Sequence, residues 1–165
     1  MWRRQPWIFV SEAGRHDGDQ GRPAPRGEAP SLDATHPTIL LVDDDPMLLD
    51  TLADLIDLRM PNARVMTCGS GAHALTMAAV TQFDVIVTDL KMPHMDGLTL
   101  ITKLRVIQPA TPILIITGHG DQVLRAEADE LGAFAFIPKP LDRETFMVSL
   151  QRALAQRGSH GQGQA

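Results

Sequence analysis

Five short apolar runs alternate with longer segments of helical periodicity, and this alternation constrains the fold more than any other feature of the chain. Three of the runs are almost continuously apolar, which is typical of parallel strands that are covered by helices on both faces. The longer segments carry candidate helix-capping residues. The pattern predicts five βα units, with strands at residues 38–42, 64–68, 85–89, 113–117 and 133–137.

Capping residues set the expected helix boundaries. Asp45 and Pro46 supply an N-cap and a first-turn proline for a helix that runs to about Met60. Gly132 is placed to end the fourth helix in a left-handed conformation, and the last helix is expected to fade near Arg157. The candidate N-caps of the other helices are Ser70, Asp96, Asp121 and Asp142.

Right-handed crossovers and the chain length favour an α/β fold with a doubly wound, five-stranded parallel sheet of flavodoxin-like order 2-1-3-4-5. In that order the first and third strands are neighbours, and ligands bind at the carboxyl ends of the strands. Polar or charged side chains end or closely follow four of the expected strands, so we expect them to converge in one site. They are Asp43, Asp44, Asp89, Thr117 and Lys139.

Three carboxylates in one pocket repel one another. Such an arrangement is tolerated only if a cation such as Mg²⁺ lies among them or if protons are taken up. Mg²⁺ prefers hard oxygen ligands and commonly uses one or two carboxylates, phosphate oxygens and waters. The predicted site therefore suits phosphate chemistry, with Asp43, Asp44 and Asp89 as candidate metal ligands.

Composition argues against several other functions. A formal charge of -5, without a cluster of Lys and Arg, argues against direct nucleic-acid binding. No apolar run approaches the roughly 20 residues of a membrane helix. Cys68 is the only cysteine, so no intrachain disulfide can form. We expect Cys68 to be a small buried residue at the end of a strand, and a reducing compartment fits at least as well as an oxidising one.

The two ends of the chain differ from its middle. Residues 1–36 are rich in Gly, Pro, Arg, Asp and Ser and sustain no apolar period, so we expect a disordered N-terminal extension there. A single domain is expected over residues 37–157. Residues 158–165 are rich in Gly, Gln and Ser, which predicts a flexible C-terminal tail and no further output domain.

Four motifs together resemble the receiver domain of two-component response regulators. They are ILLVDDDP at residues 39–46, TDLKMPHMDG at 88–97, IITG at 115–118 and PKP at 138–140. The resemblance covers residues 37–157, and the order and spacing of the motifs are specific. It implies a stand-alone cytoplasmic signalling domain rather than an enzyme with substrate turnover. Self-phosphorylation and slow autodephosphorylation are the only reactions that it implies.

The resemblance assigns a role to each acidic residue of the predicted site. Asp89 accepts a phosphoryl group from a phosphohistidine and so becomes an aspartyl phosphate. Mg²⁺ is held by Asp43, Asp44 and Asp89. The backbone carbonyl of Lys91 is the further ligand position, and any residue type can supply a carbonyl.

The same resemblance assigns the residues that respond to the phosphoryl group. Thr117 senses the phosphoryl oxygens, and Lys139 offers them a compact positive charge. Phe136, three residues before that lysine, is the expected aromatic switch residue. It acts by packing alone, because a phenyl ring has no hydroxyl group to donate a hydrogen bond.

The implied partners are proteins. A sensor histidine kinase or a histidine phosphotransfer protein supplies the phosphoryl group. A downstream effector protein binds the surface formed by the fourth helix, the fifth strand and the fifth helix. A homodimer is also compatible with the resemblance.

Two enzyme classes share part of the pattern. Residues 43–45 contain the D-x-D motif of haloacid-dehalogenase-like phosphatases, in which Asp43 is the nucleophile, but Met47 stands where Thr or Val is expected and Asp89 is left without a role. The GSGAHA run at residues 69–74 fits a loose dinucleotide-binding fingerprint. It follows the second expected strand, whereas that fingerprint belongs to the first.

Overall fold

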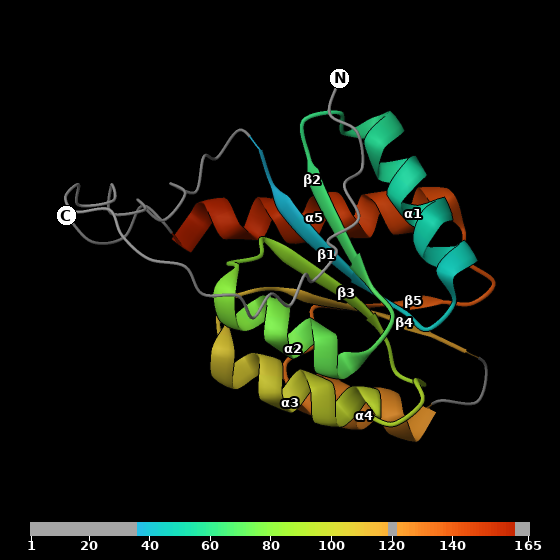
Figure 1. Cartoon of the computed structure of the whole chain (residues 1–165), viewed down its shortest axis with the longest axis vertical. Coiled ribbons are helices and arrows are strands. Elements are labelled where there is room, and N and C mark those ends of the chain that lie inside the picture. The colour runs from blue at the N-terminus through green and yellow to red at the C-terminus, as the bar shows by residue number, and fades with distance from the viewer. Residues whose placement is uncertain (1–35, 119–121, 161–165) are drawn as a thin grey trace, which may run out of the picture. The chain divides into compact units, whose positions relative to one another are not determined.

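Five parallel strands form a single sheet in the order β2-β1-β3-β4-β5 in the computed structural model, which describes residues 36–118 and 122–160, with side chains as far as residue 156. Figure 1 shows the strands side by side with helices packed on them. The predicted fold class and strand order are confirmed. The elements are β1 (Thr38–Val42), α1 (Pro46–Arg59), β2 (Arg64–Cys68), α2 (Gly71–Val80), β3 (Val85–Asp89), α3 (Gly97–Ile107), β4 (Ile113–Thr117), α4 (Gln122–Glu130), β5 (Ala135–Pro138) and α5 (Arg143–His160).

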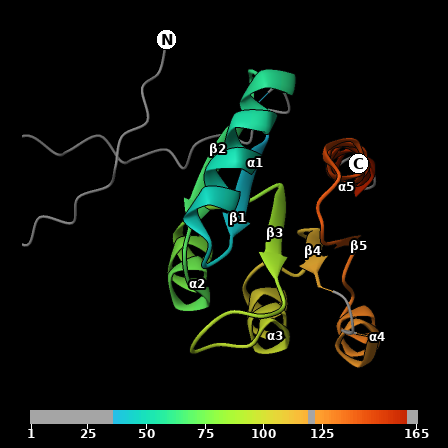
Figure 2. The ribbon, with the colours of Figure 1, turned by 90° about the vertical axis from the view of Figure 1, so that its right-hand side faces the viewer.

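Helices cover both faces of the sheet, as Figure 2 shows from its edge. α1 and α5 lie on one face, and α2, α3 and α4 lie on the other. Because successive residues of a strand point to opposite faces, Ile39 and Leu41 of β1 pack with α1 and α5, whereas Leu40 and Val42 pack on the other side. This two-sided burial explains why the central strands are apolar throughout.

The helices begin where capping residues predict. Asp45, Ser70 and Asp96 each accept a hydrogen bond from a backbone N–H group in the first turn of the helix that follows. Gly132 follows α4 with a φ of 81°, which is the predicted left-handed conformation. Asp121, the predicted N-cap of α4, lies outside the described residues.

The start of β5 differs from the prediction. The strand begins at Ala135 and not at residue 133. The N–H group of Ala133 donates to the carbonyl oxygen of Ala128 at 3.0 Å, so this residue helps to end α4. The apolar run is therefore divided between a helix cap and a strand, a division that its hydrophobicity does not reveal.

The last helix is longer than predicted. α5 starts after its predicted cap, Asp142, which accepts a hydrogen bond from the N–H group of Thr145 at 2.8 Å. It continues to His160, past the predicted end near Arg157. Gly158 is tolerated because it lies in the last turn, where no further turn depends on its conformation.

Three other expectations concern the remainder of the chain. Of the predicted extension over residues 1–36, only the last residue is described, so its disorder stays a prediction. Within residues 36–118 and 122–160, every helix is too short or too polar to cross a membrane. Cys68 is buried, as predicted, and this burial raises the pKa of its thiol to about 11.

Candidate functional site

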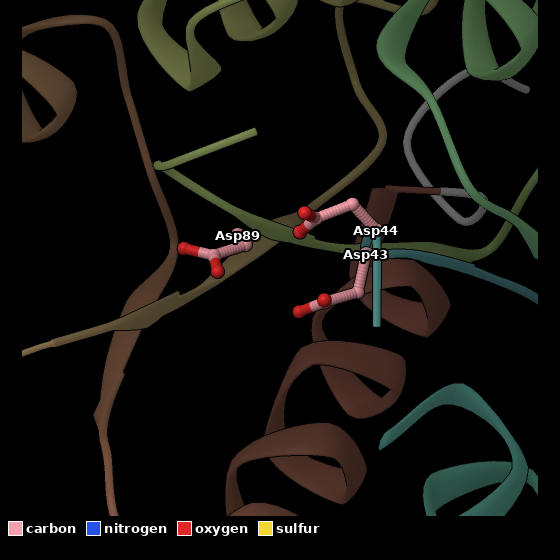
Figure 3. Close-up of side chains that lie close together, drawn as sticks. All are labelled: Asp43, Asp44 and Asp89. Carbon is pink, nitrogen blue, oxygen red and sulfur yellow. The ribbon is translucent and has the colours of Figure 1, made fainter. Parts of the chain in front are cut away.

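Three carboxylates meet at the carboxyl end of the sheet (Figure 3). Val42 of β1 is paired with Thr88 of β3. The residues that come next in each strand direction, Asp43 and Asp89, therefore stand beside each other. Asp44 completes the group, and carboxylate oxygens of the three residues lie within 4.8 Å of one another. The strand order thus brings together the three acidic residues that the sequence predicts.

Asp43 is the most confined member of the group. Its side chain is buried, and Oδ1 accepts a hydrogen bond from the N–H group of Asp45 at 2.8 Å. Oδ2 is buried and has no hydrogen-bond partner among the described residues. Burial raises the pKa of Asp43, and the charges of Asp89 and Asp44 add to that rise, while the Asp45 hydrogen bond and the Lys139 charge oppose it.

Asp89 is buried at the end of β3 but is bonded on both oxygens. Oδ1 accepts a hydrogen bond from the N–H group of Lys91 at 3.0 Å, and Oδ2 accepts one from the Nζ atom of Lys139 at 2.7 Å. The first bond fixes the loop after β3 against the carboxylate. The second forms a close ion pair across the sheet edge.

Lys139 reaches the site from the loop after β5. Its N–H group donates to the carbonyl oxygen of Thr117 at 2.7 Å, which ties this loop to the end of β4. The Nζ atom lies 3.8 Å from Asp43 Oδ2, and the side chain is 36% exposed. Burial disfavours the ammonium, but the hydrogen bond and charge of Asp89, together with the charges of Asp43 and Asp44, outweigh it and raise the pKa of Lys139.

Thr117 and Phe136 belong to β4 and β5, beside the carboxylate cluster. Among the described residues, the Thr117 hydroxyl forms no hydrogen bond with these carboxylates. The Thr117 hydroxyl is buried and donates to the carbonyl oxygen of Gly118 at 3.4 Å. Phe136 is half-buried in β5 and packs with the α2–α4 core. Its ring lies 5.0 Å from the guanidinium carbon of Arg125 in α4.

Sequence reasoning gave no role to two residues that shape this region. Gly97 starts α3, and a Cβ atom there would lie 2.5 Å from the Cα atom of Leu90 and 2.9 Å from the carbonyl oxygen of Asp89. Only glycine lets α3 approach the end of β3 so closely. Its position after the N-cap Asp96 was a usable signal. No sequence signal could have revealed the contact of Arg125 with Phe136, because no local pattern links these two positions.

The acidic group fits a divalent cation. If the three carboxylates and the Lys139 ammonium are all ionised, their net charge is −2, three negative charges less one positive. Asp43 Oδ2 is a buried acceptor that lacks a hydrogen bond within the described residues. Carboxylate oxygens are the ligands that Mg²⁺ prefers. The Lys91 carbonyl stays a predicted further ligand.

Comparison with known proteins assigns the chain to a family. The sequence profile of the response regulator receiver domain matches residues 39–151, and the chain belongs to that family. Its function is that of a phosphoacceptor receiver in two-component signalling. The comparisons give no support to the haloacid-dehalogenase-like alternative.

Two relatives and one solved structure illustrate the match. The chain is 36% identical over 118 residues to the transcriptional regulatory protein GlrR of Escherichia coli, and 33% identical over 118 residues to the transcriptional regulatory protein FixJ of Bradyrhizobium diazoefficiens. Each alignment covers 72% of this chain, but only 26% of GlrR and 57% of FixJ. The structure of the chemotaxis protein CheY4 of Vibrio cholerae matches with a TM-score of 0.66 and 30% identity, over 72% of this chain and 99% of that one.

The glycines of the dinucleotide-like run have a packing explanation. A Cβ atom on Gly71 would lie 2.8 Å from the sulfur of Met95, so the missing side chain makes room for the loop between β3 and α3. Gly69 and Gly71 flank Ser70, the N-cap of α2. This segment also follows β2, at the edge of the sheet, and not the central β1.

Proposed function

We propose that Asp89 is the phosphoacceptor of this receiver domain. The observation that carries the proposal is that Asp89 lies beside both the ammonium of Lys139, at 2.7 Å, and the carboxylates of Asp43 and Asp44. A carboxylate oxygen of Asp89 attacks the phosphorus of a phosphohistidine, the new O–P bond forms, and the P–N bond breaks with its electron pair going to the imidazole.

Asp43 is a poorer nucleophile in this geometry. Its Oδ2 lies 3.8 Å from the Lys139 Nζ atom, against 2.7 Å for Asp89 Oδ2, so Asp43 lacks the close cation that offsets the charge of an incoming phosphoryl group at Asp89. We assign Asp43 to the metal instead, with Asp44, Asp89 and the carbonyl of Lys91. Bound Mg²⁺ offsets the negative charge of the phosphoryl oxygens.

Lys139 and Thr117 are proposed to hold the phosphoryl group once it is attached. The Lys139 ammonium is already paired with Asp89 and half-open to solvent, so it can follow the charge from the carboxylate to a phosphoryl oxygen. Among the described residues, the Thr117 hydroxyl gives up a long hydrogen bond, to the Gly118 carbonyl oxygen at 3.4 Å. Turning towards the new acceptor oxygens leaves room that Phe136 can fill.

We infer the partners from this chemistry. A sensor histidine kinase or a histidine phosphotransfer protein is the donor, and the output passes to an effector through the surface of α4, β5 and α5. GlrR and FixJ are named as transcriptional regulators, so transcriptional control is a natural output for this chain, with or without a homodimer. A cytoplasmic location and slow autodephosphorylation belong to the same proposal.

Phosphorylation with a small donor tests the proposal. Acetyl phosphate and Mg²⁺ should add one phosphoryl group to the wild-type chain, and mass analysis after borohydride reduction should locate it at Asp89. Asp89→Asn should abolish labelling. Asp45→Asn is the matched control, because it removes a neighbouring exposed acid and keeps a good N-cap. Labelling at Asp43, or unchanged labelling of Asp89→Asn, would refute the assignment.

A further inference from the structure

One contact near the site has no role in binding a metal or a phosphoryl group. The guanidinium of Arg125, in α4, lies over the ring of Phe136, in β5, at 5.0 Å from the ring centroid. This separation is within the range of a cation–π interaction. Arg125 is exposed, and the stack on Phe136 is the interaction that its guanidinium makes among the described residues.

We propose that Arg125 is a positioning residue that holds Phe136 in its resting place and thereby opposes the phosphorylation switch. The inference rests on the proposed function of Asp89. In that proposal the ring of Phe136 moves towards the space that Thr117 leaves, and a ring that moves inwards withdraws from a guanidinium fixed to α4. The stack is therefore made in the resting state and lost in the activated one.

The position of the two residues supports this role. Phe136 pairs with Ile115 in the strand register, two positions before Thr117, so the two side chains lie on the same face of the sheet. Arg125 belongs to the first half of α4, on the surface proposed for effector binding. A single contact thus joins the aromatic residue to the helix that must report its movement.

Linkage gives the size and direction of the effect. A ligand that favours the activated state binds more weakly when a contact stabilises only the resting state. Removing a partly exposed cation–π contact shifts such an equilibrium by roughly two- to fivefold. Arg125→Ala should therefore bind a phosphoryl mimic such as beryllofluoride roughly two- to fivefold more tightly than the wild type.

The direction separates this proposal from a simple charge effect. Beryllofluoride bound to Asp89 is anionic, and removing a nearby cation by itself weakens the binding of an anion. Loss of the Arg125 charge alone thus predicts weaker binding, whereas loss of the stack predicts tighter binding. Arg125→Lys keeps the charge with a less favourable stacking geometry, so its affinity should lie between those of the wild type and Arg125→Ala.

The test is a beryllofluoride titration in saturating Mg²⁺, followed by the backbone amide signals of residues 122–150 and by the aromatic ring signals of Phe136. Arg125→Ala should bind more tightly, and in the free protein its Phe136 ring signals should move towards their bound positions. In a Phe136→Leu background, which has no ring to stack on, Arg125→Ala should change the affinity by less than the wild-type comparison does.

Failure of each proposal has its own signature. If the wild type does not bind beryllofluoride at all, the phosphoacceptor site itself is wrong and this inference falls with it. If the wild type binds and Arg125→Ala binds with equal or lower affinity, the site stands and the positioning role of Arg125 is refuted. An equal effect of Arg125→Ala with and without the Phe136 ring also refutes it.

Discussion

The amino and carboxyl ends of the sheet surround their buried polar groups with different partners. At the amino ends of β3 and β4, the buried amide of Gln108 accepts a hydrogen bond from the Phe83 N–H group and donates two, to the carbonyl oxygens of Ala78 and Thr81. At the carboxyl ends, Asp43 keeps one buried oxygen without a hydrogen bond inside the described ranges. The Gln108 network is satisfied by neutral groups, and the buried carboxylate of Asp84 at the same end accepts a hydrogen bond from the Thr38 N–H group at 2.6 Å. The carboxyl ends instead bring three carboxylates together, where they can hold a ligand.

The amino end also contains a half-buried cation that is satisfied without a carboxylate. Arg105 donates to the carbonyl oxygens of Pro109, Thr111 and Leu131, and also to that of Gly132. Burial lowers the pKa of its guanidinium. The comparison shows that the half-buried Arg105 charge at the amino ends is satisfied by neutral acceptors, whereas three carboxylates lie beside one another at the carboxyl ends.

The largest effect is expected from removing the hydrogen bonds of Gln108. Gln108→Leu leaves the Phe83 N–H group and two carbonyl groups without their partner, and should lower the free energy of unfolding by about 3 kcal/mol. Urea titration measures this change. Gln82→Ala, which removes an exposed neighbour of the same network, should cost about 1 kcal/mol.

The comparison also requires that this damage stays local. Folded Gln108→Leu protein should still be labelled by acetyl phosphate at the wild-type rate, because the network lies at the opposite ends of the strands from Asp89. Slow labelling of the folded variant would show that the two ends are coupled.

A backbone contact at the carboxyl ends of the strands should give the next largest effect. In Gly97→Ala the new methyl group meets the Leu90 backbone, so strand and helix must separate. Overpacking of this kind costs about 2 kcal/mol, and labelling of Asp89 should slow because the same shift moves its carbonyl. Gly71→Ala is the control: its methyl group meets only the flexible Met95 side chain. Equal losses in both variants would argue against a special role for Gly97.

These contrasts also show what the sequence could predict. The strand-end positions of Asp43, Asp89 and Thr117 followed from apolar runs and a chain order that allows few topologies. The closeness of Gly97 to Leu90 and the stack of Arg125 did not, because they depend on how helices dock and not on periodicity. Sequence order alone could not show that Asp43 Oδ2 would lack a hydrogen bond among the described residues.

The amino-end network was missed for a related reason. Gln82, Gln108 and Thr111 look like ordinary loop residues in the sequence, and most of their side-chain hydrogen bonds reach residues 25 or more positions away. Polar side chains near helix ends carry no sign of whether they face solvent or the carbonyl groups of another element. The predicted site was recoverable because charged residues after buried strands are conspicuous, and a neutral network is not.

Mg²⁺ binding should reduce the repulsion among the carboxylates at the carboxyl ends of the strands and leave the Gln108 network unchanged. Mg²⁺ at roughly ten times a millimolar dissociation constant should raise the free energy of unfolding by about 1.4 kcal/mol. Asp44→Ala should lose most of this increment, whereas Gln108→Leu should keep it, because its substitution lies away from the carboxylates. Thermal melts with and without Mg²⁺ measure the difference. An Asp44→Ala protein that keeps the full increment would place the metal elsewhere.

The smallest expected effect tests whether the carboxylate cluster destabilises the fold when no metal is bound. Burial and the neighbouring carboxylates raise the pKa of Asp43 above its ordinary value of 3.8, which means that folding disfavours its ionised form. Without metal, Asp43→Asn should therefore raise the free energy of unfolding, by on the order of 1 kcal/mol. The penalty on the ionised form is complete above the folded-state pKa and disappears as the pH falls through that value towards 3.8.

The gain from Asp43→Asn should consequently be greatest near neutral pH and shrink in acid. Urea titrations of the metal-free protein at several pH values between 4 and 7 would measure it, with Asp57→Asn, an exposed acid of α1, as the control that should change little. In Mg²⁺ the order should reverse, because the wild type gains a bound cation that the variant holds less well. If the gain is independent of pH, ionisation of Asp43 is not what destabilises the metal-free protein.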